Sequence, residues 1–145
     1  MRYVSLISTG LFLFFSLALS ATELMVHITG VDEVKGGHLM VGVYESEATF
    51  LKDDGRIAQA KLPITEAKTS ITTQFDLQVG KTYALAAYHD ANNNGKLDTN
   101  FFGIPTEGYG CSNNARGTFG PPAFEDVAFQ FTLTKNKLVS FYLSY

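Results

Sequence analysis

The residues best suited to chemistry in this chain lie in one run, Asp90-Ala91-Asn92-Asn93-Asn94-Gly95-Lys96-Leu97-Asp98. This run follows the first nine positions of the calcium-loop pattern D-x-[DN]-x-[DN]-G. Oxygens of Asp90, Asn92 and Asn94 converge when such a loop winds tightly, and the following glycine permits the sharp turn. Lys96 would add its backbone carbonyl, and Asp98 a direct or water-mediated oxygen. Hard oxygen ligands suit Ca²⁺ better than zinc or copper, so the pattern predicts a calcium site.

The calcium pattern departs from the full loop at its end. Position twelve is Phe101 rather than a bidentate glutamate, and Glu107 is the nearest carboxylate that could fold back to complete the coordination. Asp90, Asp98 and Glu107 supply at most three negative charges, so we expect weak affinity, in the range of about 10⁻⁴–10⁻³ M. The alternative is a loop rich in Asx turns that closes on its own hydrogen bonds without a metal.

The other reactive side chains lack the spacing of a catalytic site. His89 and Asp90 are adjacent, so in a strand they point to opposite faces. His27 and His38 fall in expected strands, and Cys111 is expected to be a small buried hydrophobe rather than a reactive thiol. The sequence contains no G-x-S-x-G, H-E-x-x-H, C-x-x-C or phosphate-loop motif. It therefore favours a protein that is not an enzyme, with no catalytic residues assigned.

Length and composition indicate a single folded domain. The chain has 145 residues, of which 46% are hydrophobic and 17% charged, and its net charge is −3. These values exclude a collagen-like or disordered chain and argue against a basic nucleic-acid-binding protein. The single cysteine cannot form an internal disulfide.

Residues 1–20 are expected to be a signal peptide. A short cationic start precedes an apolar run, and Ala18 and Ser20 place small residues at the −3 and −1 positions of a cleavage site after Ser20. The run is shorter than the ~20 residues that span a bilayer. No second apolar run follows, so we expect residues 21–145 to be exported, to the periplasm or beyond, without a transmembrane segment.

Alternation of apolar residues with period two predicts an all-β domain, a single antiparallel β-sandwich like that of immunoglobulins. About seven strands are expected, over residues 24–29, 39–43, 61–68, 71–77, 82–89, 127–133 and 139–143. The strand at 82–89 is apolar on both faces, which places it centrally in a sheet. One helical turn is expected near 46–51, with Phe50 and Leu51 packing. The core is expected to include Phe75, Leu85, Phe129, Phe131 and Phe141.

Residues 90–122 form one long loop between two of these strands. Loops of this length are usually functional or disordered. Disorder would expose its aromatic residues, so we expect an ordered cap over one end of the sandwich. The rings of Phe101, Phe102, Tyr109 and Phe119 are expected to pack beneath the cap; the alternative is that they offer an apolar contact surface.

Three segments resemble a known family: GHLMVGVYES, GKTYALAAYHD and HDANNNGKLDTNFFGIPTEGYGCSNNARGTFGPPAFEDVAF. They are similar to the bacterial domain of unknown function 2141 (DUF2141), a group of small exported proteins, and the similarity extends over residues 24–145. In that family the position of Cys111 is commonly aromatic, which implies a packing role for this side chain. The second segment is also similar to strands of transthyretin-like sandwiches. The resemblance implies no particular activity.

Three functions are compatible with these features. The preferred one is a non-enzymatic exported module that binds a protein or small molecule and has a calcium-ordered loop. The first alternative is a metal-dependent hydrolase-like enzyme that uses His89, Asp90 or Glu107 around the ion, and an open cleft beside His89 would favour it. The second is a transthyretin-like small-molecule carrier, which would need an apolar cavity or a dimer channel.

Overall fold

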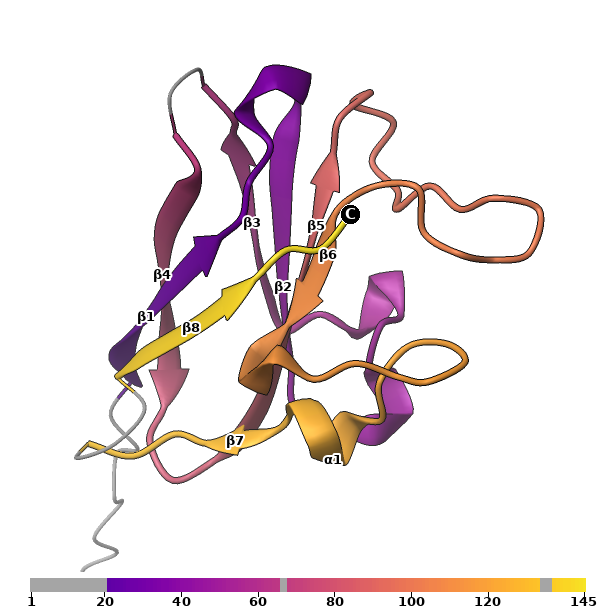
Figure 1. Ribbon diagram of the computed structural model, residues 1–145. Coiled ribbons are helices and arrows are strands. Elements are labelled where there is room, and N and C mark those ends of the chain that lie inside the picture. The colour runs from indigo at the N-terminus through magenta and orange to yellow at the C-terminus, as the bar shows by residue number, and fades with distance from the viewer. Residues whose placement is uncertain (1–20, 66–67, 134–136) are drawn as a thin grey trace, which may run out of the picture.

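The computed structural model describes residues 21–65, 68–133 and 137–145 (Figure 1). The strands in these residues are β1 (Ala21–Thr29), β2 (His38–Tyr44), β3 (Ala58–Pro63), β4 (Ser70–Gln78), β5 (Thr82–Asp90), β6 (Tyr109–Cys111), β7 (Phe129–Gln130) and β8 (Leu138–Tyr142). The helical elements are the 3₁₀ turns η1 (Glu33–Lys35), η2 (Glu47–Thr49), η3 (Asp53–Gly55) and η4 (Ser112–Asn114), and the single-turn helix α1 (Phe124–Val127). Within the described residues, no helix has the length and apolar character needed to cross a membrane.

The strands form two sheets that enclose one core. One sheet has the order β4-β1-β8, and the other the order β3-β2-β5-β6, with β7 paired to β5. Inward-facing side chains of both sheets belong to a single apolar cluster, as the alternation along each strand requires. The expected core residues are all buried: Phe75, Leu85, Phe129, Phe131 and Phe141. The expectation of a mostly β domain with these residues inside is confirmed.

One strand pairing differs from the antiparallel sandwich expected. β1 and β8 run parallel, with Val26 opposite Val139 and Ile28 opposite Phe141. Parallel neighbours cannot be joined by a tight hairpin, but these two strands lie near opposite ends of the chain and are not joined by one. Alternation shows which residues face the core and carries no information on strand direction, so the sequence could not reveal this pairing.

The strand expected over residues 127–133 is wrong for most of its length. Only Phe129–Gln130 pair in a sheet, Val127 ends α1, and Leu133 is 58% exposed. Side chains of η4 bond the carbonyls of the residues that precede β7. The Asn113 amide donates to the carbonyls of residues 126, 127 and 128, and the Ser112 hydroxyl donates to that of residue 127. Side-chain bonds of this kind compete with regular structure.

Two further expectations are met in part. The helical turn near residues 46–51 exists as η2, and Phe50 packs edge-on against the rings of Tyr44 and Phe124. Leu51 does not join the core, since it is 41% exposed. The expected strand at 61–68 begins earlier, as β3 from Ala58, and the residues 66–67 of that expectation lie outside the described part of the chain.

The central strand β5 is apolar on both faces for two reasons. It is central, as expected, with β2 and β6 as its neighbours, and its inner residues Tyr83 and Leu85 join the main core. On its outer face, Ala84 belongs to a second cluster with Tyr44, Cys111 and Val127, which includes the α1 helix. The remainder of this outer face forms the floor of a groove, described below.

Candidate functional site

The predicted calcium loop is built around the buried carboxylate of Asp90. This residue is the last of β5, and its side chain is fully buried. Its Oδ1 accepts a hydrogen bond from the Asn94 N–H (2.9 Å), and its Oδ2 accepts one from the Gly95 N–H (2.9 Å). Gly95 has φ of 79°, which a glycine adopts without strain. One carboxylate therefore winds the chain into the tight turn that the spacing predicted.

The asparagines of the loop hold its second carboxylate. Asn92 and Asn94 donate from their Nδ2 atoms to the two oxygens of Asp98, at 2.6 and 2.9 Å. Their own Oδ1 atoms accept backbone N–H bonds two residues ahead, from Asn94 and Lys96 respectively. These are Asx turns. The structure therefore brings Asp90, Asn92, Asn94 and Asp98 together in one loop, with Lys96 entering through its backbone.

Glu107 joins the beginning and the end of the Asp90–Asp98 loop. It is buried, its Oε1 accepts from the Ala91 N–H (2.9 Å) and its Oε2 from the Asp98 N–H (3.1 Å). The expected folding-back of this carboxylate onto the loop is therefore present. Among residues 21–65, 68–133 and 137–145, no group of three or more His, Cys, Asp or Glu side chains could hold a metal ion. The loop as described closes on hydrogen bonds, and calcium binding stays a prediction.

His89 lies inside the protein rather than beside a cleft. It is fully buried; its Nε2 is 2.5 Å from the Gly36 carbonyl oxygen and its Nδ1 is 2.6 Å from the Tyr145 hydroxyl. Because a carbonyl only accepts, Nε2 carries the proton and Nδ1 accepts from the tyrosine. Both ring nitrogens are therefore engaged in joining the η1 region to the C-terminal residue.

The long loop extends from the outer face of the five-stranded sheet instead of capping one end of the sandwich. The segment after β5 projects beyond the outer face of the five-stranded sheet, and part of the loop returns as β6 and η4 (Figure 1). The expectation that its rings pack beneath a cap is wrong for three of them. Phe101, Phe102 and Phe119 are 97%, 83% and 102% exposed. Hydrogen bonds order the turn that carries Phe101 and Phe102, where the Asn100 side-chain oxygen accepts from the N–H groups of Phe102 and Ile104.

A trough crosses the outer face of the five-stranded sheet. Strand register aligns Gly42 of β2 with Ala86 of β5, and Ala86 with Cys111 of β6, so small residues form a row across three strands. Larger side chains stand on both sides of the row. Tyr44 lies on one side, and on the other the register aligns Met40, Tyr88 and Tyr109. Successive rows on one face of a sheet are two residues apart, so the small row forms a depression.

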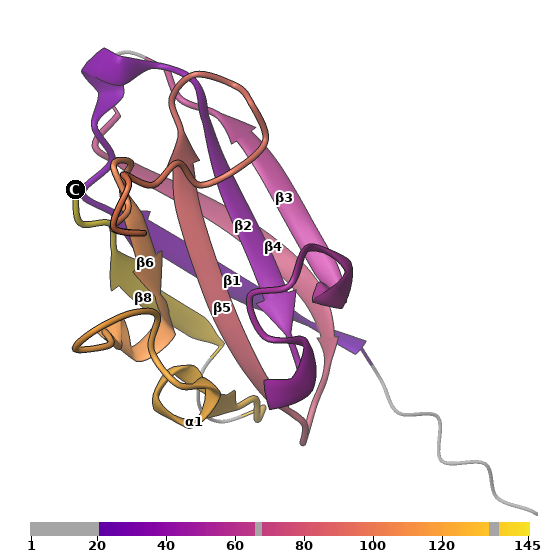
Figure 2. The same cartoon turned by 90° about the vertical axis from the view of Figure 1, so that its right-hand side faces the viewer.

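Three segments wall this trough and turn it into a groove. They are the loop 96–105, the loop 117–122 and the segment 51–56, and all three surround the outer face of β2 and β5 in Figure 2. The groove has a volume of about 870 Å³, and its rim carries the exposed rings of Phe102 and Phe119. Ligand sites usually have volumes of about 300–1,000 Å³ and a mostly apolar lining with a few polar groups. The volume and lining of this groove match that description.

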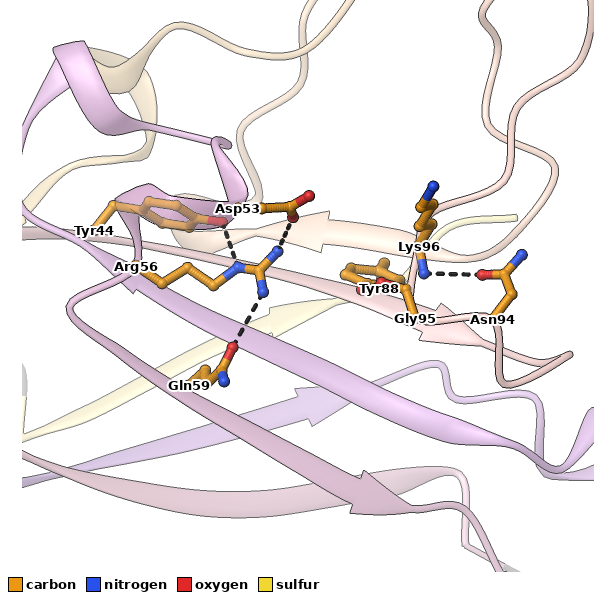
Figure 3. A network of polar contacts seen from close by, with 8 residues as sticks. All are labelled: Tyr44, Asp53, Arg56, Gln59, Tyr88, Asn94, Gly95 and Lys96. Atoms are coloured by element: carbon orange, nitrogen blue, oxygen red, sulfur yellow. Dashed lines mark hydrogen bonds and ion pairs between the residues drawn. The ribbon is translucent and has the colours of Figure 1, made fainter.

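The polar wall of the groove centres on Arg56. Its guanidinium donates to the Tyr44 hydroxyl (3.3 Å), to Gln59 Oε1 (3.1 Å) and to Asp53 Oδ1 (Figure 3). Burial opposes its charge, but the hydrogen bond to Tyr44 and the charges of Tyr44 and Asp53 outweigh burial, so the pKa of Arg56 lies above its ordinary value. Gly42 makes this position available, because a Cβ there would lie 3.1 Å from Arg56 Cδ and from the Tyr44 ring.

Tyr88 connects the groove floor to the Asp90 loop. Its hydroxyl donates to the Gly95 carbonyl (2.8 Å), and Figure 3 shows its ring between Arg56 and the Asn94–Lys96 turn. Burial raises the pKa of the Tyr88 phenol, with the charge of Arg56 opposing, so the hydroxyl keeps its proton at neutral pH. The same turn that Asp90 winds therefore fixes the direction of a groove side chain.

The groove and the loop both lie within one matched sequence family. A family model described as an uncharacterized protein conserved in bacteria (DUF2141) matches residues 26–139. The chain belongs to the DUF2141 family. The resemblance expected from its strand and loop segments is confirmed. Comparison of this DUF2141 chain with curated proteins and with solved structures gives no match.

The groove was not expected from the sequence of this DUF2141 chain, although two of its features are consistent with one. One is the apolar outer face of the strand at 82–89, and the other is the set of phenylalanines in an otherwise polar loop. The packing role expected for Cys111 agrees with its burial, which raises the pKa of the thiol to about 12. Arg56 was not singled out, because its partners come from separate elements.

Proposed function

We propose that this DUF2141 protein is a non-enzymatic binding module that holds a small molecule in the groove across β2, β5 and β6. The observation that carries the proposal is the apolar trough of about 870 Å³ with exposed phenylalanines at its rim. The outer face of an antiparallel sheet is normally polar, so an apolar outer face needs a partner. A small-molecule carrier, the second alternative above, would bind its ligand in the same way, but in a groove rather than in a central channel. The two-sheet arrangement supports a transthyretin-like or immunoglobulin-like sandwich as its fold.

We further propose export, with cleavage after Ser20. The apolar run of residues 1–20 and the small residues at its end support this. A periplasmic or extracellular location would also expose the module to millimolar calcium, the concentration that its loop would need.

The hydrolase alternative draws no support from the geometry. Both oxygens of Asp90 and both oxygens of Glu107 accept backbone N–H groups, and His89 is buried between Gly36 and Tyr145. These contacts close a loop and join segments. An open cleft beside His89 would have favoured a hydrolase. The groove described above is not lined by His89.

Filling the floor of the groove is expected to abolish binding of apolar probes. Ala86→Phe would place a ring in the row of small residues, and titration with the fluorescent probes N-phenylnaphthylamine and anilinonaphthalene sulfonate measures the loss. Ala48→Phe, which adds the same ring to an exposed residue of η2, is the matched control and should bind as wild type does. Phe102→Ser with Phe119→Ser should weaken binding without a folding cost, because both rings are exposed. Equal binding of both probes by wild type and Ala86→Phe would overturn the proposal.

We propose, third, that Ca²⁺ binds the loop through Asp90, Asn92, Asn94, the Lys96 carbonyl and Asp98, with Glu107 contributing. The one-three-five oxygen spacing and the clustering of these residues in one loop support it. The amides of Asn92 and Asn94 would have to turn, since they now present Nδ2 to Asp98, and exchanging nitrogen for oxygen is a rotation of the same group. This rotation costs hydrogen bonds and agrees with weak affinity.

Calcium is expected to raise the melting temperature by a modest amount. Binding to the folded state alone stabilises by RT ln(1 + [L]/Kd), about 1.4 kcal/mol at ten times Kd. Asp98→Asn removes one charge without changing the side-chain size and should abolish the gain, whereas Asp53→Asn in the η3 turn should retain it. Thermal unfolding at zero and at several millimolar calcium measures both. No change in wild type, together with no heat in a calorimetric titration, would leave the hydrogen-bonded Asx loop as the correct description.

A further inference from the structure

We propose that the ligand of the groove is a small amphipathic anion, with an aromatic body over the row of small residues and its anionic group on Arg56. This inference rests on the proposed binding function and adds the chemical class of the ligand. It depends on the residues that line the groove, on the hydrogen bonds that hold Arg56, and on the charged side chains around the groove.

The lining favours a flat ring system as the body of the ligand. Gly42, Ala86 and Cys111 leave a shallow floor, and tyrosine rings border it on both sides through Tyr44 and Tyr88. Aromatic rings prefer to meet other rings edge-on or in offset stacks. A flat aromatic ring system would therefore fit over the small residues of the floor, between the tyrosine rings on its two sides.

The guanidinium of Arg56 is fixed in place and has free N–H donors for an anion. Its side chain is 18% exposed, and Tyr44 and Gln59 fix the plane of the guanidinium from the sheet side. A guanidinium has five N–H donors, and the contacts with Tyr44, Gln59 and Asp53 use three of them. The remaining donors suit an anionic group with oxygen acceptors, for which arginine is the preferred partner.

The charges around the groove also favour an anion. Among the described residues that line it, Arg56 and Lys96 are cationic and Asp53 is the one carboxylate. The Asp53 side chain is 86% exposed, so its ion pair with Arg56 is a surface contact of small net value. A ligand anion can therefore share Arg56 with Asp53 or displace it, while the fixing contacts of Tyr44 and Gln59 persist.

Two probes with one ring system test the proposal. Anilinonaphthalene sulfonate carries an anionic group that N-phenylnaphthylamine lacks, and their Kd values for the full exported chain are measured by fluorescence titration. We expect the anionic probe to bind about tenfold more tightly, the value of one charge-assisted hydrogen-bonded contact. Arg56→Gln should remove this difference by weakening only the anionic probe, and Asp53→Asn should strengthen the anionic probe several-fold. Arg56→Lys, which keeps the charge, should retain part of the preference.

Lys61→Gln is the control, because Lys61 is an exposed cation on the outer face of β3 that does not line the groove. It should leave both Kd values unchanged. Circular dichroism and the melting temperature establish that each variant is folded. Equal affinity of wild type for the two probes, or an anionic preference that survives Arg56→Gln, would overturn the proposal while leaving a groove that binds neutral apolar molecules. Binding that Ala86→Phe does not affect would instead overturn the proposed function itself.

Discussion

Replacing Phe131 with alanine is expected to lower the free energy of unfolding by about 3–5 kcal/mol. The Phe131 ring is fully buried in the cluster that both sheets share, and its removal leaves a cavity that the surrounding strands cannot fill. Domains of this size are stable by only about 5–15 kcal/mol, so the variant would be close to unfolding at ambient temperature. Urea or thermal unfolding followed by circular dichroism measures the change.

Leu133→Ala is the control for this prediction. Leu133 continues the same alternating pattern two residues later but is 58% exposed, so its truncation should change stability by no more than about 0.5 kcal/mol. A large cost at Leu133 together with a small cost at Phe131 would show that the chain after β7 lies in a different register from the one described.

The second large effect is expected at Gly110, where alanine should destabilise the fold by about 3 kcal/mol, the upper part of the usual range for overpacking. A Cβ on Gly110 would lie 2.3 Å from the Tyr142 carbonyl oxygen. The clash falls where the two sheets approach, since Tyr109 and Ser144 exchange backbone hydrogen bonds of 3.0 and 2.9 Å beside it. Either β6 or the end of β8 would have to move. The melting temperature of Gly110→Ala compared with wild type measures the cost.

Gly42→Ala is the matched control for Gly110. It lies in the neighbouring part of the same sheet, but the atoms nearest to a Cβ there are side-chain atoms of Arg56 and Tyr44, at 3.1 Å. Side chains shift more readily than backbone, so the stability cost should be smaller than at Gly110 and the effect should appear in binding of the anionic probe. Equal loss of stability in the two variants would contradict the close approach of β6 and β8.

The sequence alone identified most of the strands and the residues that face the core. Phe75, Phe131 and Phe141 are buried because alternation with period two distinguishes the two faces of a strand, whatever lies opposite. The closure of the Asp90 loop was equally local. Its spacing of aspartate, asparagine and glycine determines which side-chain oxygens can reach which backbone N–H groups, and the hydrogen bonds of Asp90 and Asn92 follow that spacing.

Only the tertiary structure decided the groove and the direction of β8. The row of Gly42, Ala86 and Cys111 exists because the register of three strands brings these residues level, and each pairing is a contact between distant parts of the chain. Arg56 faces this row because η3 places it against Tyr44 of β2. A shift of two residues in register, or a reversal of strand direction, leaves the same residues facing the core. Alternation therefore cannot choose among these pairings, and hydrogen bonds between distant parts of the chain decide.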